Sequence, residues 1–124
     1  MTLRSADVHV FIRPAYPPVL CYALAPWLTQ LIDHIGAWGD NPVAASHVEE
    51  ETERLLEALG SAMVDVVLVT DEVGLSVVPS TSSGRMFRDE LGRLNAAVSA
   101  ASDHVFLVVA GRVLDLSGCP VVGE

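Results

Sequence analysis

The chain has 124 residues, of which 51% are hydrophobic and 19% charged, and its formal net charge is −9. This length and composition predict one folded domain with its own core, and they exclude a disordered chain. All basic residues are arginine, so the sequence offers no lysine for a Schiff base or a Walker A phosphate loop. The acidity argues against nucleic acid as a partner, because binding its backbone relies on many basic contacts.

The first 15 residues lack the uninterrupted apolar stretch of a secretory signal, because they include Arg4, Asp7 and His9. No apolar run approaches the ~20 residues needed to cross a bilayer. We therefore expect a cytoplasmic protein with no membrane partner. One disulfide between Cys21 and Cys119 is an option, but two separate thiols fit a chain without a secretory signal better.

Short β-branched and aromatic runs predict strands over 8–12 and 19–23, separated by a proline-rich stretch. Apolar residues then recur at helical spacing over 24–35. They predict a helix that accommodates Pro26 because this proline falls in the first turn. A loop is expected over 36–45.

Ser46 and Glu49 form a capping-box pattern, which predicts a second helix that begins near residue 46 and is followed by Gly60 as its C′ residue. Four acids are expected in its first turns, where the helix dipole favours negative charge. A metal site is the alternative interpretation, but no histidine lies at ligand spacing on the same face, and we expect no metal ion. The four acids are Glu49, Glu50, Glu51 and Glu53.

The run over 64–70 is nearly all apolar, so it predicts a strand that is covered on both faces. A loop over 71–84 is followed by a predicted helix over 85–101 and by strands over 104–110 and 113–116. Because helices alternate with apolar strands, these elements predict a single α/β domain with three layers and a mostly parallel sheet. Ligands of such domains gather outside the carboxyl ends of the strands.

Acids and arginines come together after the strand over 64–70. Asp71 and Glu72 leave that strand, and Gly74 permits a sharp turn. In the structural interpretation of this segment, Glu72 accepts hydrogen bonds from loop N–H groups while Arg88 and Asp89 fix the start of the helix. The alternative is an anion or nucleotide site formed by three arginines within nine residues, namely Arg85, Arg88 and Arg93.

The segment from Thr70 to Asn95 reads TDEVGLSVVPSTSSGRMFRDELGRLN. It resembles the C-terminal part of the bifunctional adenosylcobinamide kinase/adenosylcobinamide-phosphate guanylyltransferase family of cobalamin biosynthesis. The resemblance covers about residues 19–116, between a divergent N-terminal segment over 1–18 and a tail over 117–124. The matching positions are Glu72, Val73, Gly74, Val78, Pro79, Arg85, Phe87, Arg88, Asp89, Gly92, Arg93, Asn95, Asp103, Val105, Leu107, Val108, Val109 and Gly111.

The resemblance implies a P-loop, RecA-like α/β fold, here truncated, that assembles into a trimer. It implies an enzyme that phosphorylates adenosylcobinamide and then transfers GMP through a guanylylated histidine. His9 shares the spacing H-x(3)-R-P with that histidine, although a packed histidine within a strand is the alternative. Together with the residue pattern, the resemblance indicates candidate catalytic residues Glu72, Asp71 and His9, and candidate substrate-binding residues Arg85, Arg88, Asp89, Arg93 and Asn95.

Departures from the family pattern predict that kinase activity is lost. The sequence lacks the phosphate loop with its lysine, and Leu20 or Cys21 stands where the family has a magnesium-linked aspartate. Asp71 and Ala96 replace an asparagine and a glutamine of the pattern. We therefore expect a repurposed biosynthetic enzyme that acts on a small molecule without a cofactor. A noncatalytic binding or partner subunit, and residual nucleotidyl transfer through His9, are the alternatives.

Overall fold

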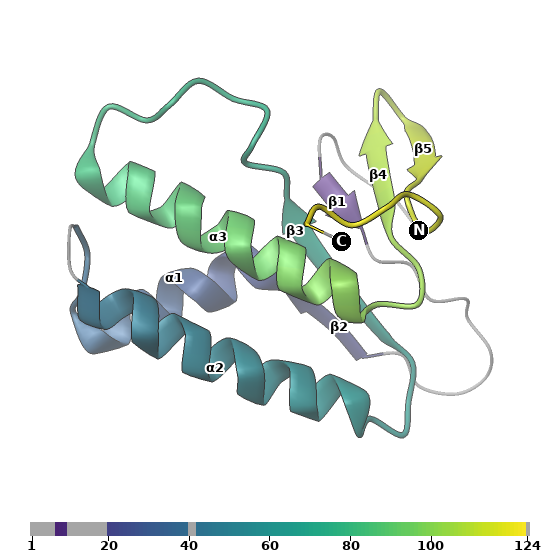
Figure 1. The fold of residues 1–124 in the computed structure, drawn as a ribbon, viewed down its shortest axis with the longest axis horizontal. Coiled ribbons are helices and arrows are strands. Elements are labelled where there is room, and N and C mark those ends of the chain that lie inside the picture. Colours follow the sequence, from purple (N-terminus) through teal and green to yellow (C-terminus); the bar gives the residue numbers. More distant parts are fainter. Residues whose placement is uncertain (1–6, 10–19, 40–41, 124) are drawn as a thin grey trace.

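The structure, a computed structural model, describes residues 7–9, 20–39 and 42–123 (Figure 1). The predicted elements are present with shifted ends, and residues 10–12 of the first predicted strand lie outside the described residues. In chain order the elements are β1 (Asp7–His9), β2 (Leu20–Ala23), α1 (Leu24–Ile35), α2 (Pro42–Gly60), β3 (Val66–Asp71), α3 (Ser82–Ala101), β4 (Phe106–Val109) and β5 (Arg112–Asp115).

The described strands form one sheet in the order β2-β3-β1-β4-β5. β2 pairs with β3 in parallel, whereas β1 is antiparallel to both β3 and β4, and β4 is antiparallel to β5. The sheet is therefore mixed rather than mostly parallel as predicted. For β5 the reason is local: only Ala110 and Gly111 connect it to β4, and both have positive φ, at 51° and 70°. Such a two-residue turn joins antiparallel strands.

Helix α1 is present as predicted from the helical spacing of its apolar residues. Leu24, Leu28 and Ile32 on its predicted apolar face are all buried. The helix ends at Gly36, whose φ of 63° places it in the left-handed conformation. Its backbone N–H donates to carbonyls of the last helical turn, as is common at helix C-termini.

Helix α2 begins at Pro42, so the prediction of a start near Ser46 is wrong. Proline is favoured in a first helical turn because its missing N–H is not needed there. The glutamates therefore follow the first turn instead of occupying it. One of them, Glu51, forms an exposed ion pair with Arg54 at 2.7 Å.

The core lies between β3 and the described helices, which pack against one another on one side of the sheet (Figure 1). Val66 and Leu68 alternate onto this side, and the intervening Val67 is also buried, as the nearly all-apolar run predicts. The architecture is mixed α/β. The buried core residues are Leu24, Leu28, Ile32, Val48, Val66, Leu68, Leu91, Leu94 and Val98.

Helix α3 begins at Ser82, three residues before its predicted start, because Thr81 caps it. The Thr81 hydroxyl accepts a hydrogen bond from the backbone N–H of Gly84 at 3.0 Å. Loop 72–81 leaves the end of β3 and runs beside α3 to that cap (Figure 1). The carboxyl end of β3 and the N-terminal half of α3 therefore frame the region where the sequence predicts a site. In the described ranges, no helix is long and apolar enough to cross a membrane.

Candidate functional site

Asn95 ties the end of β3 to α3. Its Oδ1 accepts a hydrogen bond from the hydroxyl of Thr70 at 2.5 Å, and its Nδ2 donates to the carbonyl of Asp71 at 2.9 Å. Thr70 is buried, so the amide of Asn95 satisfies a hydroxyl that has little access to water. Asn95, a predicted substrate-binding residue, thus uses both ends of its amide to position the strand that leads into the site.

Glu72 stabilises the turn that follows β3. Its Oε1 accepts a hydrogen bond from the backbone N–H of Gly74 at 2.7 Å, as the structural interpretation of this segment predicts. A Cβ at position 74 would lie 2.7 Å from the same oxygen, so glycine allows the carboxylate to approach the backbone. Glu72 is half-buried, whereas Asp71 is exposed at the end of the strand.

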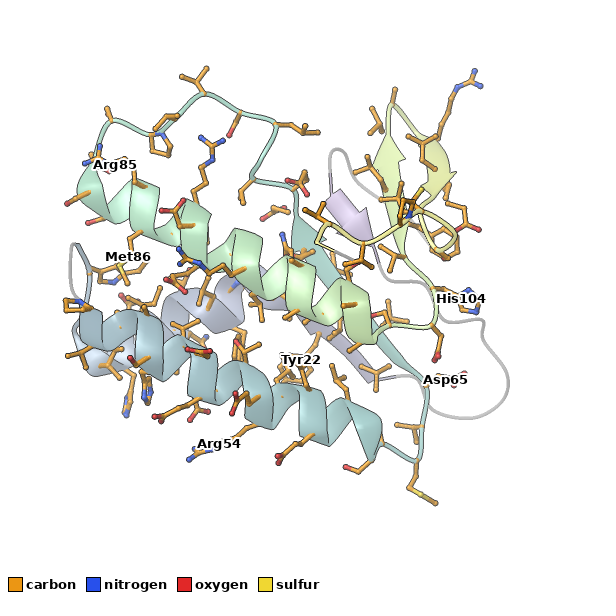
Figure 2. The ribbon with its side chains drawn as sticks, in the orientation of Figure 1. Tyr22, Arg54, Asp65, Arg85, Met86 and His104 are labelled. Atoms are coloured by element: carbon orange, nitrogen blue, oxygen red, sulfur yellow. The ribbon has the colours of Figure 1, made fainter. Side chains whose placement is uncertain are left out.

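The three arginines of this segment have different partners. Arg88 donates through Nη2 to the carbonyl of Gly74 at 3.4 Å. Arg85 lies at the N-terminal end of α3, where Nη1 donates to the carbonyls of Pro79 and Ser80 at 3.3 and 3.2 Å (Figure 2). Arg93 pairs with Glu90 through Nη1 and Oε1 at 2.7 Å. Two of the three arginines therefore hold loop 72–81 against the helix.

An open pocket of about 390 Å³, called here the loop–α3 pocket, lies between the start of that loop and α3. It brings together four of the predicted site residues, whereas Asp71, Arg85 and Asn95 do not line it. Two carboxylates and two guanidiniums can orient a small polar molecule that carries an anionic group. The lining residues are Glu72, Val73, Gly74, Arg88, Asp89, Gly92, Arg93 and Ala96.

His9 belongs to β1, in the middle of the described sheet. Its backbone pairs with Val69 of β3 and Phe106 of β4, while Asp7 pairs with Asp71. The pairing places β1 beside the strand that leads into the site. The position of the imidazole lies outside what the structure describes, so its role as the guanylylated histidine stays a prediction.

Within residues 7–9, 20–39 and 42–123, the acidic, histidine and cysteine residues do not gather into a metal-ligand cluster. No group of three or more His, Cys, Asp or Glu side chains in these ranges lies close enough to hold a metal ion. Magnesium takes oxygen ligands, and neither Leu20 nor Cys21 has a side-chain oxygen to offer at the position where the family pattern has an acid. The position at which the family pattern has a magnesium-linked acid therefore carries no oxygen-bearing side chain in this sequence.

Glu90 is a buried acid, 6% exposed, that is not among the residues predicted for the site. A signal was available, because Glu90, Leu94 and Ala97 follow the spacing i, i+4 and i+7 of a single helix face. A carboxylate among apolar residues on such a face is unusual, since burial of a charge is unfavourable without a partner. Here the partner is Arg93.

The family model described as cobinamide kinase / cobinamide phosphate guanyltransferase matches residues 5–116 of this chain. The chain is 42% identical over 110 residues to the bifunctional adenosylcobalamin biosynthesis protein CobU of Escherichia coli K12, covering 84% of this chain and 60% of that protein. It is 35% identical over 103 residues to the corresponding protein CobP of Pseudomonas aeruginosa, covering 83% and 55%.

A third similar protein is CobU of Salmonella typhimurium, with 44% identity over 64 residues. That match covers 52% of this chain and 35% of the relative. The chain thus spans between 35% and 60% of the length of these curated relatives.

Proposed function

Because the chain belongs to the cobinamide kinase/cobinamide phosphate guanyltransferase family, we propose that it is a divergent member without ATP- or GTP-dependent kinase activity. Its relatives connect it to cobalamin biosynthesis. In our proposal it acts as a small-molecule enzyme of a biosynthetic pathway and shares the three-layer, P-loop-like fold of the family. The observation that carries the proposal is the loop–α3 pocket, where Arg88 and Arg93 face a cavity that Glu72 also lines.

The arginines of the loop–α3 pocket favour a substrate with an anionic group. Arg88 makes one weak bond to a loop carbonyl within the described residues, so most of its five N–H donors remain for a ligand. The Arg93 side chain is 67% exposed and can contribute a second positive charge. Two guanidiniums on one helix suit a phosphate or a carboxylate, which accept parallel hydrogen bonds from the planar group.

Glu72 is the proposed acid or base of the reaction. The Gly74 N–H holds one carboxylate oxygen in place, and no other described residue donates to Oε2. A positioned carboxylate with a free oxygen beside a cavity can take a proton from a bound substrate or supply one to it. Asp89, on the α3 side of the same pocket, orients the substrate in this proposal.

Two features of the sequence support the loss of kinase activity, and a third, at Ala96, concerns the substrate contacts of the family pattern. The chain contains no lysine, so any phosphate-loop cation would have to come from elsewhere. The acid that binds magnesium in the family pattern is replaced by Leu20 or Cys21. Ala96, which stands in place of a glutamine, lines the loop–α3 pocket and leaves it without that amide.

Anion binding is the first test of this proposal. Pyrophosphate titrated into the protein by isothermal calorimetry should bind, and Arg88→Ala should weaken binding by about tenfold, because a charge-assisted contact is lost. Arg54→Ala is the matched control: Arg54 is an exposed arginine on α2 that points away from the loop–α3 pocket (Figure 2). Equal affinities for Arg88→Ala and the wild type would refute an anion site at this position.

Catalysis is tested separately, through Glu72. Glu72→Gln keeps an oxygen to accept from Gly74 but removes the titratable group, so the turn should form while turnover of a candidate substrate is lost. Unchanged turnover would exclude Glu72 as the acid or base. Incubation with labelled GTP should give no acid-labile protein adduct. An adduct that His9→Asn abolishes would instead favour residual nucleotidyl transfer.

A noncatalytic partner subunit is the second candidate, and exposed apolar residues of loop 72–81 favour it. Leu75 and Val77 are 82% and 90% exposed, next to the loop–α3 pocket. Apolar side chains gathered in one exposed loop are typical of a contact surface. That surface could serve the homotrimer that the family resemblance implies. Sedimentation velocity should then show a trimer that Leu75→Ser with Val77→Ser dissociates, and a wild-type monomer would count against this candidate.

A further inference from the structure

A groove of about 550 Å³ lies between α2 and α3, and we call it the α2–α3 groove. It has no part in the proposed function. It is large enough for a small organic ligand, and most of its lining is apolar. It shares Arg93 with the loop–α3 pocket. The lining residues are Ala45, Val48, Glu49, Thr52, Glu53 and Leu56 of α2, and Glu90, Arg93, Leu94 and Ala97 of α3.

We propose that the α2–α3 groove binds a small organic cation, namely an ammonium group carried on an apolar chain or ring. The first observation is the carboxylate of Glu90, whose side chain is 8% exposed. Arg93 pairs with its Oε1, and no other described residue donates to its Oε2. A buried carboxylate with a free oxygen is unfavourable unless a donor reaches it, and an ammonium group in the groove supplies one.

The second observation is the charge of the opposite wall. Glu49 and Glu53 lie one turn apart on α2, are exposed and have no ion-pair partner among the described residues. Together with Glu90 they place three carboxylates around the groove, against one guanidinium from Arg93. This excess of negative charge attracts a cation and repels an anion, whereas in the loop–α3 pocket two arginines balance two carboxylates.

The apolar part of the groove accounts for the rest of the ligand. Val48, Leu56 and Leu94 provide aliphatic surface on both helices. The hydroxyl of Thr52 already donates to the carbonyl of Val48 at 2.7 Å, so towards a ligand in the groove this hydroxyl can only accept a hydrogen bond, which suits an ammonium donor. A hydrated inorganic ion would gain nothing from this surface, whereas an alkylammonium ion buries its chain there while its charge meets Glu90.

The probe is hexylamine, compared with hexan-1-ol and hexanoate, which share its chain but are neutral and negative. Each is titrated into isotopically labelled protein at neutral pH and followed by amide chemical shifts. Hexylamine should shift amides of α2 and α3 and bind about tenfold or more tightly than hexanol, because only its charge complements the carboxylates. Equal affinity for hexanol, or shifts confined to other elements, would overturn the proposal.

Two variants test whether hexylamine binds through the carboxylates of Glu90 and Glu53. Glu90→Gln should weaken hexylamine binding by about tenfold. If this variant fails to fold, the exposed Glu53→Gln serves instead, with a smaller expected loss of about threefold. Glu50→Gln is the matched control, because Glu50 is exposed on the same helix but does not line the groove.

Loss of affinity in Glu50→Gln equal to that in the groove variants would indicate only a general effect of charge, and would refute the site. Concentration-dependent shifts of the same amides without hexylamine would show that a second copy of the chain occupies the groove instead.

Discussion

The two halves of α3 are held in place by different forces. In the C-terminal part, from Leu91 to Ala101, the side chains of Leu91, Leu94 and Val98 pack into the core and are at most 2% exposed. In the N-terminal half, Arg85 and Arg88 donate to carbonyls of loop 72–81 at 3.2 to 3.4 Å. A buried leucine contributes about 2–5 kcal/mol, whereas a hydrogen bond at the surface contributes about 1 kcal/mol or less. The fully buried apolar side chains of α3 therefore lie from Leu91 onward, whereas Met86 and Phe87 of the N-terminal part are only partly buried against the core. Most of the residues that line the loop–α3 pocket lie outside the C-terminal part.

The largest effect should come from the core half of α3. Leu94→Ala would leave a cavity where a side chain 1% exposed now packs, and should lower the free energy of unfolding by about 2–5 kcal/mol. Urea unfolding followed by circular dichroism measures this. Leu75→Ala on loop 72–81 is the matched control, and should change stability by less than about 0.5 kcal/mol because Leu75 is mostly exposed. If Leu94→Ala and Leu75→Ala lost equal amounts of unfolding free energy, the core packing of α3 would not be the main source of stability.

Asn95 joins α3 to the end of β3, so its removal should have the next largest effect. Asn95→Ala leaves the buried hydroxyl of Thr70 and the carbonyl of Asp71 without their partner, and should cost about 1–3 kcal/mol of unfolding free energy. A double-mutant cycle with Thr70→Val tests the contact. The two losses should be non-additive, because both variants remove the same hydrogen bond. Additive losses would show that the pair does not couple β3 to α3.

The N-terminal half of α3 should respond more weakly. Thr81→Ala removes the side-chain oxygen that caps the Gly84 N–H, and should cost about 1 kcal/mol. Hydrogen exchange at the Gly84 amide should accelerate, while exchange at Leu94 should follow the global loss of stability alone. Thr81→Ser keeps the hydroxyl and should restore slow exchange at Gly84. A Ser variant that exchanges as fast as the Ala variant would argue against the cap.

The smallest effect is expected outside both halves, at Asp115. Hydrogen bonds from the side chain and backbone N–H of Ser117 lower the pKa of Asp115 from its ordinary value of 3.8. Because the folded state favours the charged carboxylate, this contribution is present above the ordinary pKa and is lost as pH falls through the lowered folded value. The Ser117 amide shift should titrate with a midpoint below 3.8, and Asp115→Asn should abolish the titration. A midpoint at or above 3.8 would be inconsistent with these bonds.

The spacing of apolar residues predicted a helix correctly where one face of that helix packs into the core. The spacing of Leu24, Leu28 and Ile32 was sufficient, because a buried helical face repeats every three to four residues. The start of α2 was missed because the capping-box pattern at Ser46 competed with Pro42, and proline suits a first turn. The direction of β1 was not predictable, since its three residues carry no signal for the strands on either side.

The sequence indicated candidate residues for the site but not how they lie relative to one another, and their roles stay predictions. Glu72, Arg88, Asp89 and Arg93 do line one pocket, because residues of one helix face meet the loop that begins at the strand end. Arg85 does not, since the N-terminal end of α3 carries it away to the carbonyls of loop 72–81. Which acceptor an arginine finds depends on the path of that loop, and no local pattern specifies the path.

Arg93 lines both the loop–α3 pocket and the α2–α3 groove, so a ligand in one cavity can affect binding in the other. If both proposed ligands bind, a cation that neutralises Glu90 would weaken the ion pair between Glu90 and Arg93, and the Arg93 guanidinium would then attract an anion in the loop–α3 pocket more strongly. Thermodynamic linkage makes the effect reciprocal: the anion must strengthen binding of the cation by the same factor. A single side chain would thereby give this small domain heterotropic cooperativity without any movement of its backbone.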